Sequence, residues 1–258
     1  MTGEVRLQRD GGIATVTLAN PEKLNAVTAD MWRRLGTVMA ELDADDSLRA
    51  VILRGAGENF AAGGDLDEFR HARATIELAL AYHETVGIAL TAVERCRHPT
   101  LAAIRGACVG GGLEIACACD LRIAGESSRF GAPINRLGFS MYPGELAGLL
   151  KLAGPAVAKE ILLEGRLFTA GEALAKGLLT RVVAEDDVEG EVARTATRIA
   201  AGAPLAARAH KWWIARLLEG RPLSEDEKRQ SFAFLATADY REGLDAFEAK
   251  RTPAFTGT

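Results

Sequence analysis

The sequence has few of the residues from which metal and disulfide sites are built. Its four cysteines, at positions 96, 108, 117 and 119, lack the paired C-x-x-C spacing of a zinc site, and its four histidines are scattered. We therefore expect no metal site. Most of the cysteines stand among alanine and valine, which is typical of small core side chains in a reducing compartment.

The sequence also lacks long apolar runs and an excess of positive charge. Residues 1–12 are polar, without the apolar core of a signal peptide, and no later run is expected to span a membrane. The net charge is -4 at pH 7 and the sequence pI is about 5.7, which argues against a nucleic acid as the partner. We expect a cytoplasmic protein that contacts neither membranes nor nucleic acids.

Its glycine-rich segments lack the features of nucleotide-binding and serine-dependent enzymes. Gly55 and Gly57 are followed by Phe60 where a dinucleotide fingerprint needs its third glycine. No phosphate-binding loop with an adjoining Lys-Ser/Thr occurs, and no G-x-S-x-G elbow supplies a nucleophilic serine. These absences argue against a Rossmann dehydrogenase and a serine hydrolase.

What the chain does contain is an ordinary globular composition, 48% hydrophobic and 26% charged over 258 residues. This length allows one large domain, or one domain with a small appendage. Residues 5–7 and 13–18 predict a β-hairpin around Asp10-Gly11-Gly12. Further along the chain, short apolar strands alternate with helical patterns, which predicts an α/β fold.

The most informative segment is residues 104–120, where an apolar strand, a glycine turn and a helix follow one another. Gly110, Gly111 and Gly112 remove every Cβ from the turn, so a ligand can approach the backbone closely. The first N–H groups of a helix are unpaired and attract negative charge, which suits a developing oxyanion. Glu114 is then either a charge that complements the helix dipole or an acid/base beside an oxyanion site.

Two segments together resemble the enoyl-CoA hydratase/isomerase family, the crotonases. The glycine turn with Glu114 three residues after Gly111 is similar to one family motif, and residues 60–66, Phe-Ala-Ala-Gly-Gly-Asp-Leu, are similar to another. The resemblance implies that Gly64 and Gly111 provide the two oxyanion amides and that Glu114 transfers a proton. It also implies that coenzyme A enters as part of the substrate, with no separate cofactor.

The resemblance also implies where coenzyme A would bind. The loop Asn20-Pro-Glu-Lys-Leu-Asn-Ala26 matches an Asn-Pro-x-x-x-Asn-Ala segment that borders the CoA pocket in the family. Residues near the C-terminus match a segment that, often from a neighbouring subunit, touches the adenine and phosphate end of CoA. The implied CoA-binding residues are Lys23, Leu24, Ala26, Ala62, Asp65, Leu66, Phe247 and Lys250.

The similarity covers most of the chain, residues 20–255, and implies a crotonase-like spiral of ββα units with a C-terminal helical region. We expect residues 1–190 to form the core that carries the CoA and oxyanion site. Residues 191–258 would form a helical trimerisation region, and the assembly would be a homotrimer or a dimer of trimers. The aromatic side chains of the terminal helices are then expected at the subunit contacts.

One departure from the family pattern concerns the catalytic acids. Where hydratases of the family place a second glutamate, this chain has Ile134, which can neither hold nor deprotonate water. A further acid, Glu145, follows Pro143-Gly144 and is either a helix N-terminal charge or a substitute catalytic carboxylate. His71 and His83 are expected to be surface or packing residues, because the sequence places no partner beside them.

Three functions remain open from the sequence. The best guess is hydration of a 2-enoyl-CoA in fatty-acid or related acyl-CoA metabolism, with Glu114 and Glu145 positioning water. The second is an enoyl-CoA isomerase that needs one carboxylate, and the third is a non-catalytic acyl-CoA binding protein. Ile134 favours the second and third, whereas Glu114 beside the glycines weighs against the third.

Overall fold

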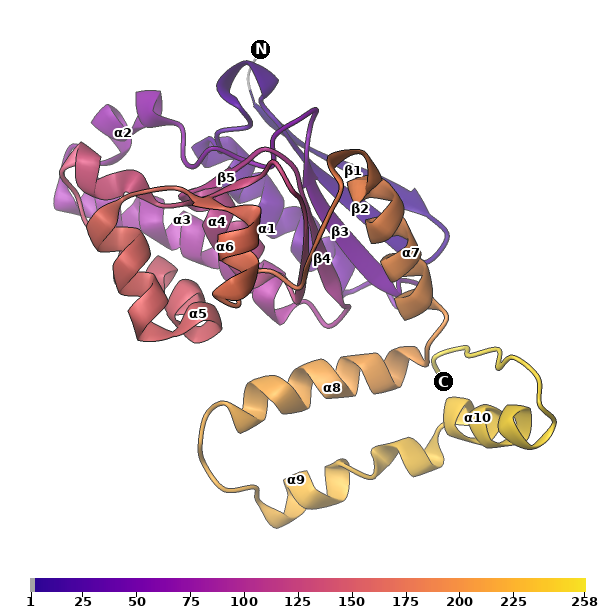
Figure 1. Cartoon of the computed structure of the whole chain (residues 1–258). Helices are drawn as coiled ribbons and strands as arrows, with labels where there is room; N and C mark the ends of the chain where they lie inside the picture. Colours follow the sequence, from indigo (N-terminus) through magenta and orange to yellow (C-terminus); the bar gives the residue numbers. More distant parts are fainter. Residues whose placement is uncertain (1–2) are drawn as a thin grey trace.

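The computed structural model describes residues 3–258 and shows a layered α/β core with a separate layer of C-terminal helices (Figure 1). The chain begins with an antiparallel hairpin of β1 (Glu4–Asp10) and β2 (Ile13–Ala19), as predicted. The turn between them places Gly11 at φ 52°, a conformation that glycine adopts without strain. Side chains of β2 alternate between the core and a half-buried face, which fixes the register.

The core contains a larger and a smaller β-sheet. The larger has the strand order β1-β2-β3-β4-β6-β9 and is parallel from β2 onwards, while the smaller has the order β5-β7-β8. The remaining strands of the larger sheet are β3 (Ala50–Gly55), β4 (Thr100–Ile104), β6 (Leu121–Gly125) and β9 (Arg181–Val183). Those of the smaller sheet are β5 (Ala107–Val109), β7 (Arg129–Gly131) and β8 (Phe168–Thr169).

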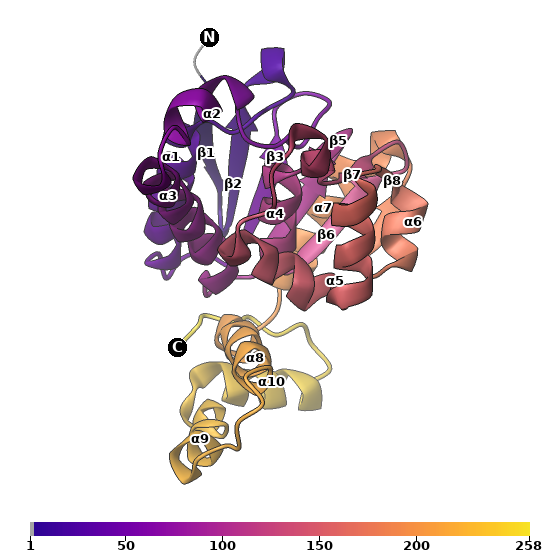
Figure 2. The same cartoon turned by 90° about the vertical axis from the view of Figure 1, so that its left-hand side faces the viewer.

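The chain visits the two sheets in turn and then forms a helix, which confirms the predicted spiral of ββα units. One turn runs through β4, β5 and α4 (Gly111–Ala118). The next runs through β6, β7 and α5 (Pro143–Glu164), which contains a break at Gly154, where φ is 73°. Strand β4 pairs in parallel with β6, and β5 with β7, so the second of these turns stacks on the first (Figure 2).

Three helices lie on one side of the larger sheet. They are α1 (Ala29–Asp43), α2 (Leu66–Ala72) and α3 (Ile76–Arg95), and α3 packs against both α1 and α2. Thr28 caps α1 by accepting a hydrogen bond from Met31 N, and the apolar stripe predicted from Met31 to Leu42 is buried. Helices α2 and α3 are separated by a short break, and Thr75 caps α3 by accepting a hydrogen bond from Leu78 N. Four short 3₁₀ segments complete the connections: η1 (Pro21–Lys23), η2 (Pro133–Leu137), η3 (Glu185–Asp187) and η4 (Ala233–Ala236).

Helix α3 is long and apolar enough to cross a membrane by length and composition, the one such helix within residues 3–258. The sequence analysis expected no such run, but the glutamates of α3 are spaced far apart along it. This single helix is weak evidence for a membrane, because core helices can pass the same test. One face of α3 is buried in the core, including Tyr82, Val86, Ala89 and Val93.

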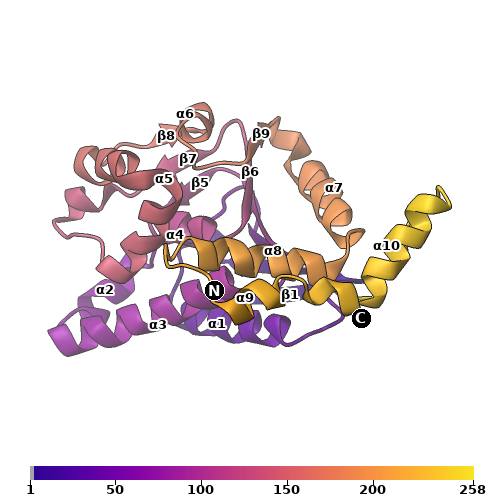
Figure 3. The ribbon, with the colours of Figure 1, turned by 90° about the horizontal axis from the view of Figure 1, so that it is seen from below.

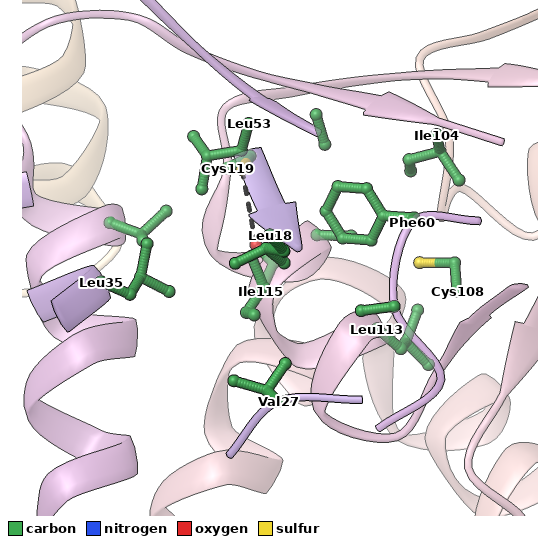
Figure 4. Packing of buried hydrophobic residues seen from close by; sticks show 14 of the residues in the cluster. Leu18, Val27, Leu35, Leu53, Phe60, Ile104, Cys108, Leu113, Ile115 and Cys119 are labelled. Atoms are coloured by element: carbon green, nitrogen blue, oxygen red, sulfur yellow. Dashed lines mark hydrogen bonds between the residues drawn. The ribbon is translucent and has the colours of Figure 1, made fainter. Parts of the chain in front are cut away.

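The main core fills the space between the helices and the inner faces of both sheets (Figure 4). Phe60 and Cys108 approach each other there from the two glycine-bearing segments, beside Ile104 and Leu113. All four cysteines are free, and three of them are buried, as expected for small core residues. Close packing in this cluster joins α1, through Leu35, to the two glycine-bearing segments.

The C-terminal part of the chain leaves the core after α7. Helix α6 (Ala170–Ala175) begins with a capping box of Thr169 and Glu172, and α7 (Val188–Ala200) packs against the larger sheet. The expected boundary after residue 190 therefore falls inside a core helix. The helices beyond it are α8 (Pro204–Leu217), α9 (Glu225–Gln230) and α10 (Ala238–Glu248).

These last helices form a layer of their own beneath the core (Figures 1 and 3). Helix α8 is joined to the core by polar contacts, including Lys211 Nζ to Asp120 Oδ2 at 2.6 Å and Arg208 to Asp46 at 3.2 Å. Large apolar side chains of this layer remain exposed, among them Trp212, Phe232 and Phe247. The layer therefore buries little of its own apolar surface within one chain.

The close approach of backbone at Gly112 gives a test of this fold. A Cβ on Gly112 would lie 2.2 Å from Ala61 O, so Gly112→Ala should destabilise the protein by about 1–3 kcal/mol. Gly171→Ala in α6 is the matched control, because nothing lies within 4 Å of its Cβ position, and it should be neutral or stabilising. Urea unfolding measures both, and an equally stable Gly112→Ala variant would contradict the packing described.

Candidate active site

Two glycine segments from different turns of the spiral meet at the carboxyl ends of the strands. Residues 60–61 pair with the segment before α4, through Phe60 N to Arg105 O at 2.8 Å and Ala61 N to Ala107 O at 2.9 Å. Val109 N donates back to Ala61 O at 3.0 Å. This ladder fixes the two glycine turns against each other.

The amides of Gly64 and Gly111 are neighbours at the end of this ladder. Gly64 N is 3.5 Å from the position that a Cβ on Gly111 would occupy. Within residues 3–258, neither amide N–H donates a hydrogen bond to a protein acceptor. Gly111 is the first residue of α4, so its N–H has no partner within the helix. The geometry brings together the two donors predicted for an oxyanion site.

Glu114 lies in the first turn of α4 and lines the same pocket as Gly64 and Gly111. Its backbone N–H donates to Gly110 O at 3.0 Å, which holds the first turn in place. In the described part of the chain, no side chain or backbone group is hydrogen-bonded to its carboxylate. The carboxylate is therefore available to a bound molecule.

Glu145 supplies a second carboxylate to the pocket, from the first turn of α5. Its side chain is only 8% exposed, and Oε1 lies 2.5 Å from Nδ1 of His83 on α3. The ring of His83 is in turn stacked on Tyr142, with centroids 4.7 Å apart. Glu145 is thus more than a solvent-facing helix charge.

His83 is a further polar residue of the pocket, and the sequence did not predict it there. The sequence places no partner beside it, which is wrong, because His83 is hydrogen-bonded to Glu145 inside the pocket as well as packed against Tyr142. The two residues are 62 positions apart, and the sequence offered no signal that α3 would lie against the start of α5. His71, by contrast, is exposed on α2.

The two carboxylates have raised pKa values. Burial raises the pKa of Glu114 above its ordinary value, and the negative charge of Glu145 raises it further. Burial also raises the pKa of Glu145, although the hydrogen bond from His83 opposes the shift. The nearby Arg73 favours the ionised form of both groups but does not cancel the effect of burial. Burial therefore favours a proton on these carboxylates, and the charge of Glu145 favours it further on Glu114.

The pocket has a volume of about 340 Å³ and is lined mainly by aromatic and aliphatic side chains. Ile134 lies in its wall on η2, so the position of the missing family glutamate faces the same space. The aromatic residues of the wall come from α1, α2, α3 and the segment before α5. They are Trp32, Phe69, Tyr82, Phe139 and Tyr142.

Of the predicted CoA-binding residues, some line the pocket and the others do not. Ala62 and Leu66 line the pocket directly, and Leu66 is 52% exposed at its edge. Asp65 instead caps α2 by accepting a hydrogen bond from Asp67 N, and its carboxylate pairs with Lys23 at 2.7 Å. These contacts tie the loop of residues 20–26 to the oxyanion segment.

The remaining residues of that loop have backbone roles. Leu24 O accepts a hydrogen bond from Ala62 N at 3.0 Å, while the Leu24 side chain is half exposed. Ala26 is buried next to Val27, whose N–H donates to Gly63 O at 2.7 Å. The loop therefore supports the Gly63-Gly64 turn from one side.

Phe247 and Lys250 do not join the pocket within one chain. Both lie at the end of α10 in the C-terminal layer, and Phe247 is 83% exposed. Lys250 has a φ of 52° and follows the helix directly. Neither residue lines the pocket that contains Glu114.

A second, more open groove of about 760 Å³ lies between α1 and α3. It contains none of the oxyanion glycines and no part of Glu114, although His83 and Tyr142 border both spaces. Across the chain from residue 3 onward, no group of three or more His, Cys, Asp or Glu side chains could hold a metal ion. The chemistry described below is therefore assigned to the smaller pocket.

The raised pKa of Glu114 predicts a pH-dependent stability change. Between the ordinary carboxyl pKa and the raised one, the folded chain holds a proton that the unfolded chain has lost, so stability falls as pH rises through this range. Glu114→Gln removes this pH-dependent loss of stability and should raise the Tm at alkaline pH. The expected rise is about 2–4 °C for each kcal/mol of folding stability regained, with no rise near pH 4. Calorimetry across pH measures the effect.

A matched control for this change is Glu126→Gln, since Glu126 is an exposed carboxylate outside the pocket. It alters the net charge equally but should give no comparable alkaline gain. Equal Tm shifts in the two variants would show that Glu114 is not destabilised by burial.

Comparisons with known proteins show the family of this chain. The family model described as enoyl-CoA hydratase/isomerase matches residues 8–258. A probable enoyl-CoA hydratase of Mycobacterium bovis is 36% identical over 98% of this chain and 97% of its own length. The short-chain-enoyl-CoA hydratase of Clostridium acetobutylicum is 33% identical over 96% of this chain and 95% of its own.

A solved structure extends the likeness to three dimensions. The enoyl-CoA hydratase/carnithine racemase from Magnetospirillum magneticum is 51% identical, with a TM-score of 0.97, over 100% of this chain and 97% of that one. The family match and the relatives cover nearly the whole chain rather than the glycine motifs alone. The chain therefore belongs to the enoyl-CoA hydratase/isomerase family and has the crotonase fold.

Proposed function

We propose that this protein hydrates a 2-enoyl-CoA, with Glu114 and Glu145 as its acid/base pair. The observation that supports this is the presence of two carboxylates in the pocket that also holds the free amides of Gly64 and Gly111. Glu145 reaches the pocket from α5 and supplies the second carboxylate that Ile134 cannot. A CoA thioester would bind with its carbonyl oxygen between the two amides.

In this mechanism the two amides stabilise the negative charge that develops on the thioester oxygen as water adds to Cβ. Glu145 is assigned as the base, since the hydrogen bond with His83 favours its ionised form. It takes one proton from water while the water oxygen bonds to Cβ. Glu114 is assigned as the acid, because burial and the charge of Glu145 favour its protonated form, and it delivers its proton to Cα.

His83 acts through Glu145 in this proposal. When Glu145 is ionised, the ring N–H donates to its carboxylate, and stacking on Tyr142 holds the ring in place. The imidazole thus positions the carboxylate of Glu145. We place the reaction in fatty-acid or related acyl-CoA metabolism in the cytoplasm.

The proposal predicts that each carboxylate is required for hydration. Glu114→Gln and Glu145→Gln should each lower kcat for hydration of crotonyl-CoA by about 100-fold or more, because each removes one proton-transfer group. Loss of enoyl absorbance measures turnover, and calorimetry should show that both variants still bind the thioester. Glu126→Gln, outside the pocket, is the control and should keep the wild-type rate.

An isomerase is the second candidate, because Ile134 occupies the position of the second hydratase glutamate. If only Glu114→Gln reduces activity and a 3-enoyl-CoA is converted to the 2-enoyl isomer, with solvent deuterium at the shifted carbon, isomerisation replaces hydration. If the wild-type protein binds acyl-CoA but catalyses neither reaction, its function is that of a non-catalytic acyl-CoA binding protein.

We also propose that the chain assembles as a trimer or a dimer of trimers through its C-terminal helices. Exposed apolar residues in that layer support this, including Trp212, Ile214 and Leu218, which are 45%, 62% and 63% exposed. In this assembly, Phe247 and Lys250 of one subunit would reach the CoA bound to its neighbour.

Light scattering tests the assembly directly. The wild-type mass should be three or six times the chain mass of 27.4 kDa, and Trp212→Asp should shift it towards the monomer, because a charge is placed in an apolar contact. A wild-type monomer at micromolar concentration would contradict the proposal.

A further inference from the structure

Arg73 places a cation in the wall of the active-site pocket. It follows α2 as its C-terminal cap and lines the space that also contains Glu114. Its guanidinium carbon lies 3.7 Å from the centroid of the Phe69 ring, 4.7 Å from that of Phe139 and 5.4 Å from that of Tyr82. Aromatic rings therefore hold the guanidinium beside the pocket.

This guanidinium has no anionic partner among the residues that the structure describes. No carboxylate forms an ion pair with Arg73, and its Nε is shielded from water without a hydrogen-bond acceptor. The other half-buried or buried arginines have acceptors: Arg105 pairs with Glu185 and Arg216 with Glu227, while the buried Arg122 donates to backbone carbonyls. An unbonded Nε also occurs in Arg54, Arg97 and Arg208, but each of these forms an ion pair, whereas Arg73 has neither an ion pair nor a hydrogen-bond acceptor among the described residues.

The aromatic neighbours do not satisfy the hydrogen-bonding capacity of Arg73. Rings interact with the cation through their electron-rich faces, whereas the N–H donors of a guanidinium lie in its plane and need oxygen acceptors. A shielded N–H without an acceptor is unfavourable unless a bound molecule supplies one. The position of Arg73 in the pocket wall makes the substrate the available source.

The carboxylates of the pocket do not take this role either. Glu145 is hydrogen-bonded to His83, and Glu114 forms no ion pair in the described chain. Their pKa values remain raised by burial although Arg73 favours their ionised forms, so Arg73 is not neutralised by a close pair. A planar guanidinium matches a carboxylate through two parallel hydrogen bonds.

We propose that the acyl group of the substrate carries a second carboxylate, which Arg73 binds, so that the substrate is a CoA thioester of an unsaturated dicarboxylic acid. This inference rests on the proposed function, because it assumes that the pocket holds a CoA thioester. Phe69 and Phe139 then serve two purposes: they line the apolar path of the acyl chain and hold the guanidinium at its end.

The experiment compares acids with their neutral esters in binding to the full-length protein. Calorimetry gives Kd values for glutaryl-CoA and adipyl-CoA, for the monomethyl ester of each, and for butyryl-CoA. The wild-type protein should bind at least one of the acids about 10- to 100-fold more tightly than its ester, as expected for a charge-assisted bidentate contact. None of these saturated thioesters requires turnover.

Variants then assign the preference to Arg73. Arg73→Met should reduce the ratio of ester to acid Kd to near one, while Arg73→Lys, which keeps the charge, should retain part of it. The matched control is Arg70→Met on the same helix, because Arg70 is exposed and outside the pocket, and its ratio should stay at the wild-type value. Arg136 also lines the pocket, from an exposed position on η2.

Each outcome decides the proposal. Equal binding of acids and esters by the wild-type protein overturns it, whether or not Arg73→Met folds. Loss of the preference in Arg136→Met but not in Arg73→Met overturns the assignment to Arg73. Tight butyryl-CoA binding without a preference for acids leaves the proposed function standing, whereas no binding of any thioester refutes the proposed function as well.

Discussion

The site depends on a short ladder of backbone hydrogen bonds between residues 60–61 and residues 105–109. Hydrogen bonds at Phe60, Ala61 and Val109 hold the residues before Gly64 against those before Gly111. Because the ladder ends just before the glycines, two N–H groups are left without protein acceptors at one point in space. A rigid arrangement of this kind is what oxyanion stabilisation requires, since donors that need no rearrangement act with full strength.

The absence of side chains at the glycines makes this ladder possible. A Cβ on Gly112 would overlap Ala61 O, and one on Gly64 would lie 2.9 Å from the ring of Phe69. The same requirement explains why this part of the site could be predicted from sequence. Glycines needed for close backbone contact stand in a fixed order between a strand and a helix, and this local pattern is visible without the fold.

Other features could be predicted because they too are local. The first hairpin, the cap of α1 at Thr28 and the capping box at Thr169 and Glu172 each depend on neighbouring residues. His83 could not be assigned in this way, since its role depends on α3 lying against the first turn of α5. Arg73 is a similar case, because its aromatic neighbours come from both sides of that contact.

The unusual element of the site is therefore a polar group assembled from three different turns of the chain. Glu114 comes from α4, Glu145 from α5, and the histidine that holds Glu145 from α3. Burial disfavours two negative charges in one pocket. The pKa values of both carboxyl groups are therefore raised, which favours a proton on one of them. An acid and a base then exist together at the same pH. In the proposed function, hydration would use this pair from α4 and α5, in place of the second glutamate whose position Ile134 occupies.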